Sequence, residues 1–193
     1  MRTIKNGLKS IYTYLFNFGK ICRFKSFGKG SFIGRRCTVH FAGEGITIGN
    51  RVRIGNDARL SLYATSENEA SISIGDGCYI GTHFSILTAA PITNGKNCSI
   101  ASFVTILGEN HGINPEIGNY GGQPLLAKPV VIGDGVWLGE KVSVMPGVTI
   151  GEKAIVGTCA VVTKDIPAYC MAVGNPAKVI KRYNFANHEW EKL

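Results

Sequence analysis

The sequence lacks several signals that would assign a protein to a class at once. Its six cysteines include no Cys-x-x-Cys pair, so neither a zinc knuckle nor a dithiol redox motif is indicated. No apolar run reaches the roughly 20 residues that span a membrane. The first residues show neither the apolar stretch nor the cleavage site of a signal peptide. We therefore expect a cytoplasmic protein with reduced cysteines.

Acidic residues are missing from the beginning of the chain. Residues 1–36 contain nine Lys or Arg residues and no Asp or Glu, whereas the remaining 12 basic and 13 acidic residues nearly cancel. The net charge of +8 therefore belongs to the N-terminal arm. A basic arm could contact phosphates, but the body is neutral and carries no base-reading motif, so we expect no nucleic acid partner.

An amphipathic helix is predicted for residues 3–19. Its apolar residues fall on one stripe at helical spacing, and they are Ile4, Leu8, Ile11, Leu15 and Phe18. This helix could cover the open end of a repeat structure or contact another copy of the chain. It could instead lie on an anionic membrane surface at the inner face of the membrane. We assign residues 1–28 to this helix and a basic linker.

What the sequence does contain is a repeat of six residues. Its main apolar positions between residues 131 and 164 are Ile132, Leu138, Val144, Ile150, Val156 and Val162. A second set follows four residues after the first five of these: Val136, Val142, Val148, Ala154 and Ala160. A period of six fits neither a helix nor a continuous strand. It indicates a parallel β-helix of hexapeptides, in which three hexads make one coil of a triangular prism with coils about 4.8 Å apart.

The repeat predicts an all-β domain over residues 29–182. Cys37, Cys78 and Cys98 occupy the slot that Val and Ala fill elsewhere, so we expect them to be small buried hydrophobic residues. One long interruption, the loop 108–128, is longer than most connections, which favours a functional role. Residues 183–193 are predicted as a C-terminal tail, either a loose helix or a surface strand. The spacing does not set the hand of the β-helix, although crossovers are usually right-handed.

Five segments stand out besides the repeat itself: Asn110-His111-Gly112 and residues 131–139, 146–151, 162–167 and 173–180. These segments resemble the hexapeptide-repeat O-acetyltransferases, of the maltose/galactoside type and of the related capsule and O-antigen branch. The basic, aromatic N-terminal helix is closer to the capsule branch. The resemblance implies a left-handed parallel β-helix and a homotrimer with an active site between subunits. It further implies acetyl-CoA as co-substrate, no metal, and a carbohydrate acceptor in surface polysaccharide biosynthesis.

His111 is the candidate catalytic residue. Transfer of an acetyl group from a thioester to a hydroxyl needs a base, a hydrogen-bond donor for the oxyanion and a clamp for CoA. Histidine is the commonest general base, and His111 lies where the repeat is interrupted. The alternative is a solvated loop histidine. By its motif, His111 resembles the catalytic histidine of the family.

The resemblance also implies residues that bind acetyl-CoA: Trp137, Glu140, Thr158, Thr163, Lys164, Lys178 and Lys181. Lysines at such a site act as point charges for phosphate groups, although ordinary solvated lysines are the alternative. Trp137 could wall the site or be structural. His83 is a candidate for acceptor binding, with a surface strand histidine as the alternative.

Other functions stay open at this point. A xenobiotic acetyltransferase of the streptogramin or chloramphenicol type would use the same donor. A zinc enzyme like the γ-type carbonic anhydrases would need three histidine ligands, and after His111 the next histidine is His188. A β-helix scaffold without enzymatic activity is the third alternative.

Overall fold

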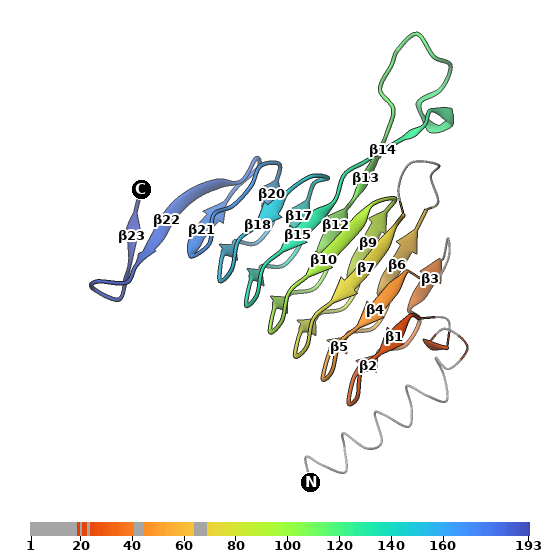
Figure 1. The fold of residues 1–193 in the computed structure, drawn as a ribbon. Helices are drawn as coiled ribbons and strands as arrows, with labels where there is room; N and C mark the ends of the chain where they lie inside the picture. Colours follow the sequence, from red (N-terminus) through yellow and green to blue (C-terminus); the bar gives the residue numbers. More distant parts are fainter. Residues whose placement is uncertain (1–18, 20, 23, 41–44, 64–68) are drawn as a thin grey trace.

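The structure is a computed structural model of the chain, and it describes residues 19, 21–22, 24–40, 45–63 and 69–193. The predicted helix over residues 3–19 therefore lies, apart from Gly19, outside the described residues. The described part is an all-β, parallel three-sheet β-helix, as the repeat predicts (Figure 1). The three sheets form the sides of a prism.

We name the sheets A, B and C in the order in which the chain visits them. Sheet A consists of β1 (Ser26–Phe27), β4 (Ile46–Ile48), β7 (Ser71–Ile74), β10 (Pro91–Asn94), β15 (Val130–Ile132) and β18 (Thr149–Ile150). Sheet B consists of β2 (Phe32–Ile33), β5 (Arg53–Ile54), β8 (Tyr79–Ile80), β11 (Ser99–Ile100), β16 (Trp137–Leu138), β19 (Ile155–Val156), β21 (Cys170–Val173), β22 (Lys178–Asn184) and β23 (Glu189–Lys192). Sheet C consists of β3 (Thr38–His40), β6 (Arg59–Leu62), β9 (Ser85–Thr88), β12 (Thr105–Leu107), β17 (Ser143–Val144) and β20 (Val161–Val162).

Two elements depart from the parallel prism. Between β12 and β15 the chain forms an antiparallel hairpin of β13 (Glu109–His111) and β14 (Leu125–Ala127), with a short 3₁₀ helix η1 (Tyr120–Gly122) in its loop. At the C-terminal end, β22 and β23 join sheet B as antiparallel strands. Of the two alternatives for residues 183–193, the strand is the one observed.

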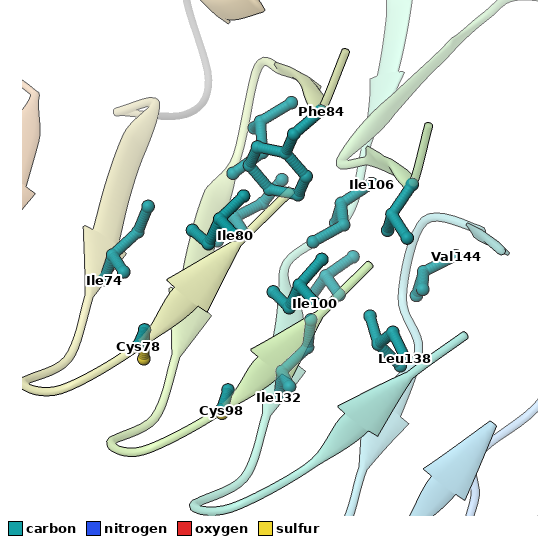
Figure 2. Close-up of a cluster of buried hydrophobic side chains, with 14 of the residues drawn as sticks. Ile74, Cys78, Ile80, Phe84, Cys98, Ile100, Ile106, Ile132, Leu138 and Val144 are labelled. Atoms are coloured by element: carbon teal, nitrogen blue, oxygen red, sulfur yellow. The ribbon is translucent and has the colours of Figure 1, made fainter. Parts of the chain in front are cut away.

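The core lies inside the prism and follows the six-residue repeat. All of the apolar repeat positions from Ile132 to Val162 are buried, as are the residues four places after them. Figure 2 shows the isoleucines of successive coils stacked on one another, with Cys78 and Cys98 among them. Cys37 is buried as well, so the prediction of small buried hydrophobic cysteines is confirmed. Burying each large apolar side chain contributes about 1.5–3 kcal/mol.

The turns between sheets stack in columns along the edges of the prism. We call these edges corner AB, corner BC and corner CA. At corner BC one residue per coil has left-handed backbone with φ between 54° and 61°, and these residues are Arg36, Asp57, His83, Phe103, Lys141 and Cys159. Glycine is required where one turn lies directly on the next: a Cβ on Gly139 would lie 2.7 Å from the backbone nitrogen of Thr158.

Candidate functional site

The hairpin of β13 and β14 carries His111 away from the prism at corner CA (Figure 1). His111 pairs with Leu125 across the hairpin, and its side chain is exposed. The base of the hairpin is tied to the prism, because Gly108 donates to the carbonyl of Leu87 and accepts from the amide of Lys128. An imidazole so placed is open to a substrate and is carried by paired strands.

A buried glutamine organises the loop beyond His111. Gln123 is 6% exposed; its Oε1 accepts from the amide of Asn114 at 3.0 Å, and its Nε2 donates to the carbonyls of Asn114 and Ile117 at 2.7 and 2.8 Å. Gly112, next to His111, leaves no room for a side chain, since a Cβ there would lie 2.7 Å from Oε1 of Gln123. Gln123 thus fixes the loop from inside. Nothing in the sequence singled it out, because a lone loop glutamine has no pattern.

His83 lies at corner BC in a ladder of stacked side chains. Arg36 donates to both carboxylate oxygens of Asp57, at 2.6 and 2.7 Å. Nε2 of His83 lies 3.8 Å from Oδ2 of Asp57, and the His83 ring stacks on Phe103 with centroids 4.6 Å apart and planes at 7°. Hydrogen bonding by Arg36 is the main cause that lowers the pKa of Asp57, with a smaller contribution from His83. His83 is therefore held between an anion and an aromatic face, with half of its side chain exposed.

Glu140 and Thr158 lie further along the same corner. They belong to successive turns, and the amide of Cys159 donates to the carbonyl of Glu140 at 2.8 Å. Both side chains are exposed. The contact between their turns goes through backbone atoms, which leaves both side chains free to face a ligand.

Thr163 and Lys164 lie at a different edge, corner CA, directly after β20. His111 follows β12 at this same edge, and β17 lies between β12 and β20 in sheet C. Two strand spacings separate the levels of β12 and β20, roughly 10 Å along the prism. The fold thus brings Thr163 and Lys164 to the edge that carries the histidine.

Trp137, Lys178 and Lys181 belong to sheet B. Trp137 is 53% exposed on the outer face of this sheet, in a pocket that also contains residues of the C-terminal strands. Lys178 and Lys181 lie on β22, where Lys181 is opposite Met171 of β21. The fold therefore places the predicted residues in two groups on one chain: a histidine group at corner CA, and a second group at corner BC and on sheet B.

The described part of the chain contains no group of three or more His, Cys, Asp or Glu side chains placed to hold a metal ion. Within the same residues, no helix is long and apolar enough to cross a membrane. All six cysteines are free thiols, with Cys22 and Cys159 exposed.

Comparisons with known proteins identify the repeat and the family. The bacterial transferase hexapeptide family (six repeats) matches residues 129–164, and the hexapeptide repeat of succinyl-transferase matches residues 26–58. The putative lipopolysaccharide biosynthesis O-acetyl transferase WbbJ of Escherichia coli K12 is 33% identical over 159 residues, which cover 76% of each chain. Galactoside O-acetyltransferase of the same organism is 36% identical over 115 residues, covering 60% of this chain and 56% of that protein.

A solved structure of galactoside acetyltransferase in complex with coenzyme A is also similar. It is 31% identical, has a TM-score of 0.56, and the match covers 69% of this chain and 66% of that one. The chain spans 56–63% of the length of most of the curated relatives that it matches.

Proposed function

The chain belongs to the hexapeptide-repeat acetyltransferase family, and on this premise we propose that it transfers an acetyl group from acetyl-CoA to a hydroxyl group of a carbohydrate. The observation that carries the proposal is the position of His111. This histidine is exposed on a hairpin that interrupts an otherwise regular prism, and the loop beyond it is held by the hydrogen bonds of Gln123.

In this reaction His111 acts as the general base. One of its imidazole nitrogens takes the proton of the acceptor hydroxyl while the hydroxyl oxygen attacks the thioester carbonyl carbon. His111 then returns the proton to the sulfur as the carbon–sulfur bond breaks, so the products are an acetyl ester and the CoA thiol. The acetyl group passes directly from sulfur to the hydroxyl oxygen, so no covalent intermediate forms on the protein. An exposed loop histidine can approach both substrates.

The acetyl-CoA clamp consists of Thr158, Glu140 and Trp137 beside the lysines of the C-terminal part. Lys164, Lys178 and Lys181 supply positive charge for the phosphate groups of the co-substrate. The coenzyme A bound in the structure of the 31% identical galactoside acetyltransferase supports coenzyme A as the carrier of the acetyl group. The acceptor would lie against His83, whose ring is oriented by Asp57 and Phe103.

We propose that the working unit is a homotrimer of left-handed prisms. Within one chain, His111 extends from corner CA while Thr158 and His83 lie at corner BC. These two edges are the opposite borders of sheet C, so the two groups are separated by the width of that sheet. A neighbouring subunit can bring its corner BC to the histidine, and three copies related by a threefold axis would make three equal sites.

One relative with a broad match supports a class of acceptor. WbbJ, at 33% identity over 76% of both chains, is named a putative lipopolysaccharide biosynthesis O-acetyl transferase, so we propose a surface polysaccharide precursor as the acceptor. The nine basic residues of the first 36 would bring the N-terminal arm to an anionic membrane surface where such precursors are assembled.

An acetyl-CoA turnover assay tests the proposal. Purified protein is incubated with acetyl-CoA and, in parallel, with nucleotide sugars, lipid-linked oligosaccharides, free sugars, chloramphenicol and a streptogramin. Release of free CoA thiol with a carbohydrate supports the proposal. Turnover with only the antibiotics would replace the carbohydrate by a xenobiotic, and the absence of CoA binding by calorimetry would favour a scaffold without enzymatic activity.

A further inference from the structure

The N-terminal end of the prism carries a surplus of positive charge that the next coils lack. Residues 24–63, which include the first two coils, contain seven basic and two acidic residues and have a net charge of +5. Residues 64–167, which include the next four coils and the hairpin, contain five basic and nine acidic residues, a net charge of −4. Figure 1 shows the first two coils at the opposite end of the prism from β22 and β23. Charge is therefore separated along the axis of the prism.

The basic side chains surround this end and do not gather on one side of it. In the second coil Arg51 lies in the turn at corner AB, Arg53 is exposed on sheet B, and Arg59 is exposed on sheet C. In the first coil one lysine directly precedes β1, and the other basic residues lie in the turns at corners AB and BC. We call the whole set the basic collar: these three arginines together with Lys25, Lys29, Arg35 and Arg36, all of them exposed.

Most of the collar charge is not neutralised by neighbouring carboxylates. The single ion pair of the collar among the described residues joins Arg36 to Asp57 at 2.6 Å. Arg51 and Arg53 have no carboxylate partner within ion-pair distance in that part of the chain. The two coils lie about 4.8 Å apart, which is less than the Debye length of roughly 8 Å at physiological ionic strength. Their fields therefore add, and all of them attract an anionic surface in front of this end.

The collar is held in place by hydrogen bonds. Nε of Arg59 donates to Oγ of Ser61 at 3.1 Å, and its Nη2 donates to the phenol oxygen of Tyr63 at 3.2 Å. These neutral hydroxyls fix the guanidinium without cancelling its charge. The first two coils are also joined turn to turn, because the amide of Lys29 donates to Oδ1 of Asn50 at 2.9 Å. Groups that are fixed before binding lose less conformational entropy when a partner arrives.

Phenylalanine side chains lie among the basic ones at the same end. Phe24 is buried in the core, and its ring contacts that of Phe27 with centroids 6.2 Å apart. Phe27 and Phe32 are half-buried in the first coil, so part of each residue remains exposed. Basic groups beside partly exposed aromatic rings are the combination that binds at the headgroup level of a membrane.

We propose that the basic collar docks the prism end-on against an anionic phospholipid surface. The inference extends the membrane contact proposed for the N-terminal arm to the folded prism, and it does not depend on acetyl transfer. A flat anionic surface can meet charges on all sides of one end at once. A linear anionic polymer would be matched by a basic stripe along one face. The strands that follow in sheets B and C, as far as β19 and β20, contain no lysine or arginine.

End-on docking also sets the height of the candidate active site above the membrane, and this consequence rests on the proposed function. The strands β3, β6, β9 and β12 are successive neighbours in sheet C, and His111 follows β12 along the chain. The level of β12 is three strand spacings from β3, roughly 14 Å along the prism. A lipid-linked acceptor would therefore present its hydroxyl to His111 at about this distance from the collar.

Cosedimentation with lipid vesicles tests the inference. Full-length protein is mixed with vesicles of phosphatidylcholine alone and with vesicles that also contain phosphatidylglycerol. We expect binding to the anionic vesicles only, and we expect it to weaken as the salt concentration rises. The triple variant Arg51→Gln, Arg53→Gln and Arg59→Gln should have a partition coefficient lower by about a hundredfold, because each basic residue near an anionic surface contributes about fivefold.

Two matched variants control for net charge and for folding. Lys96→Gln, Lys141→Gln and Lys153→Gln together remove the same charge from exposed positions of later coils, and vesicle binding should stay close to wild type. Lysine at the three arginine positions of the collar keeps the charge and should keep the binding, and circular dichroism checks that every variant is folded.

The outcomes of cosedimentation are distinct. Equal losses in the two glutamine variants would overturn the inference, because net charge alone would then explain binding. It would also be overturned by unchanged binding of the collar variant, or by wild-type protein that binds dextran sulfate but no vesicles, since the partner would then be an anionic polymer. None of these measurements involves acetyl transfer, so each of these failures leaves the proposed function standing.

The two exposed cysteines report the orientation of the bound prism. Cys22 lies at the collar end between the buried residues Ile21 and Phe24, whereas Cys159 lies in the turn between β19 and β20. Five strand spacings, roughly 24 Å, separate the first coil from this turn. A fluorescent donor is attached to one cysteine while the other is replaced by serine, and energy transfer to an acceptor dye on the vesicle lipids is measured. End-on docking predicts much stronger transfer from Cys22 than from Cys159. Equal transfer from the two positions would show that the prism lies on its side and would overturn the inference.

Discussion

At the scale of single residues, the structure shows how side chains far apart in the sequence become neighbours. Asp57 accepts hydrogen bonds from Nε and Nη2 of Arg36, which is 21 positions away in the sequence, and it lies beside His83. The coils contain different numbers of residues. Hydrogen bonds between adjacent coils show this, since they join residues that are 21, 26, 20 and 38 positions apart in the sequence. The varying insertions at corner CA cause this difference. A fixed period therefore predicts the core, but it cannot predict which corner residues stack.

The Asp57 carboxylate should make stability depend on pH in a defined window. Its pKa is lowered from 3.8 in the folded protein, mainly by the hydrogen bonds of Arg36. A depressed folded pKa means that the contribution to stability is present above 3.8 and is lost as the pH falls through the folded value. We expect Asp57→Asn to lower the Tm at pH 6–7, and the difference from wild type to shrink below pH 3.8.

Thermal unfolding followed by circular dichroism over this pH range measures the effect. Asp165→Asn serves as the control for a turn carboxylate. Asp165 lies at corner CA and accepts a hydrogen bond from the backbone amide of Thr149, but it forms no ion pair with an arginine among the described residues. A difference between wild type and Asp57→Asn that stayed constant down to pH 2 would show that the ion pair does not stabilise the corner.

At the scale of elements, the repeat predicts the prism closely and the hairpins poorly. Ile132, Leu138 and Val144 are spaced by six residues and all face the interior of the prism. Because these positions must be apolar, they leave a strong pattern in the sequence. Predictions weaken where the period stops. The aromatic side chains of residues 183–190 show no spacing rule, because an antiparallel pair of strands needs only local alternation. The sequence predicts the loop 108–128 as an interruption of the repeat, but it does not predict the hydrogen bonds of Gln123 that hold this loop together.

Gln123 should hold the loop beside the proposed catalytic residue His111 in place, and it should contribute little to the stability of the prism. Its side chain makes three hydrogen bonds inside the loop and none to the prism. In Gln123→Ala we expect kcat to fall about tenfold, because a small misplacement of a catalytic group has this scale of cost. The KM for acetyl-CoA and the Tm should stay close to wild type.

Steady-state kinetics and hydrogen exchange of the loop amides check this prediction together. Exchange should speed up at Asn114, whose amide donates to Gln123, and stay slow in the strands of the prism. A variant with faster exchange and an unchanged kcat would separate the order of the loop from catalysis.

At the scale of the whole molecule, the candidate residues lie on different edges of one prism. The family resemblance implies a site shared between subunits, and we propose such a site because His111 at corner CA and Thr158 at corner BC lie on opposite borders of sheet C. Assembly is therefore part of the proposed catalytic site. The sequence can indicate this only through resemblance, since an exposed position in one chain carries no mark of which copy covers it.

Complementation between two inactive variants tests the shared site. His111→Ala removes the base, and Thr158→Trp blocks the groove at an exposed position of corner BC. Co-expressed at equal levels, the two should assemble into mixed oligomers in which about a quarter of the sites join an intact histidine to an intact groove. We expect a corresponding fraction of wild-type activity. A mixture no more active than either variant alone would place the whole site within one chain.

The most direct test of the central claim is the rate of acetyl transfer by His111→Ala. With an acceptor found by the turnover assay, loss of the general base should lower kcat by at least about two orders of magnitude. The affinity for acetyl-CoA, measured by calorimetry, should stay within about twofold of wild type, since the proposed clamp does not include His111. Wild-type turnover in a purified, correctly assembled His111→Ala protein would contradict the account.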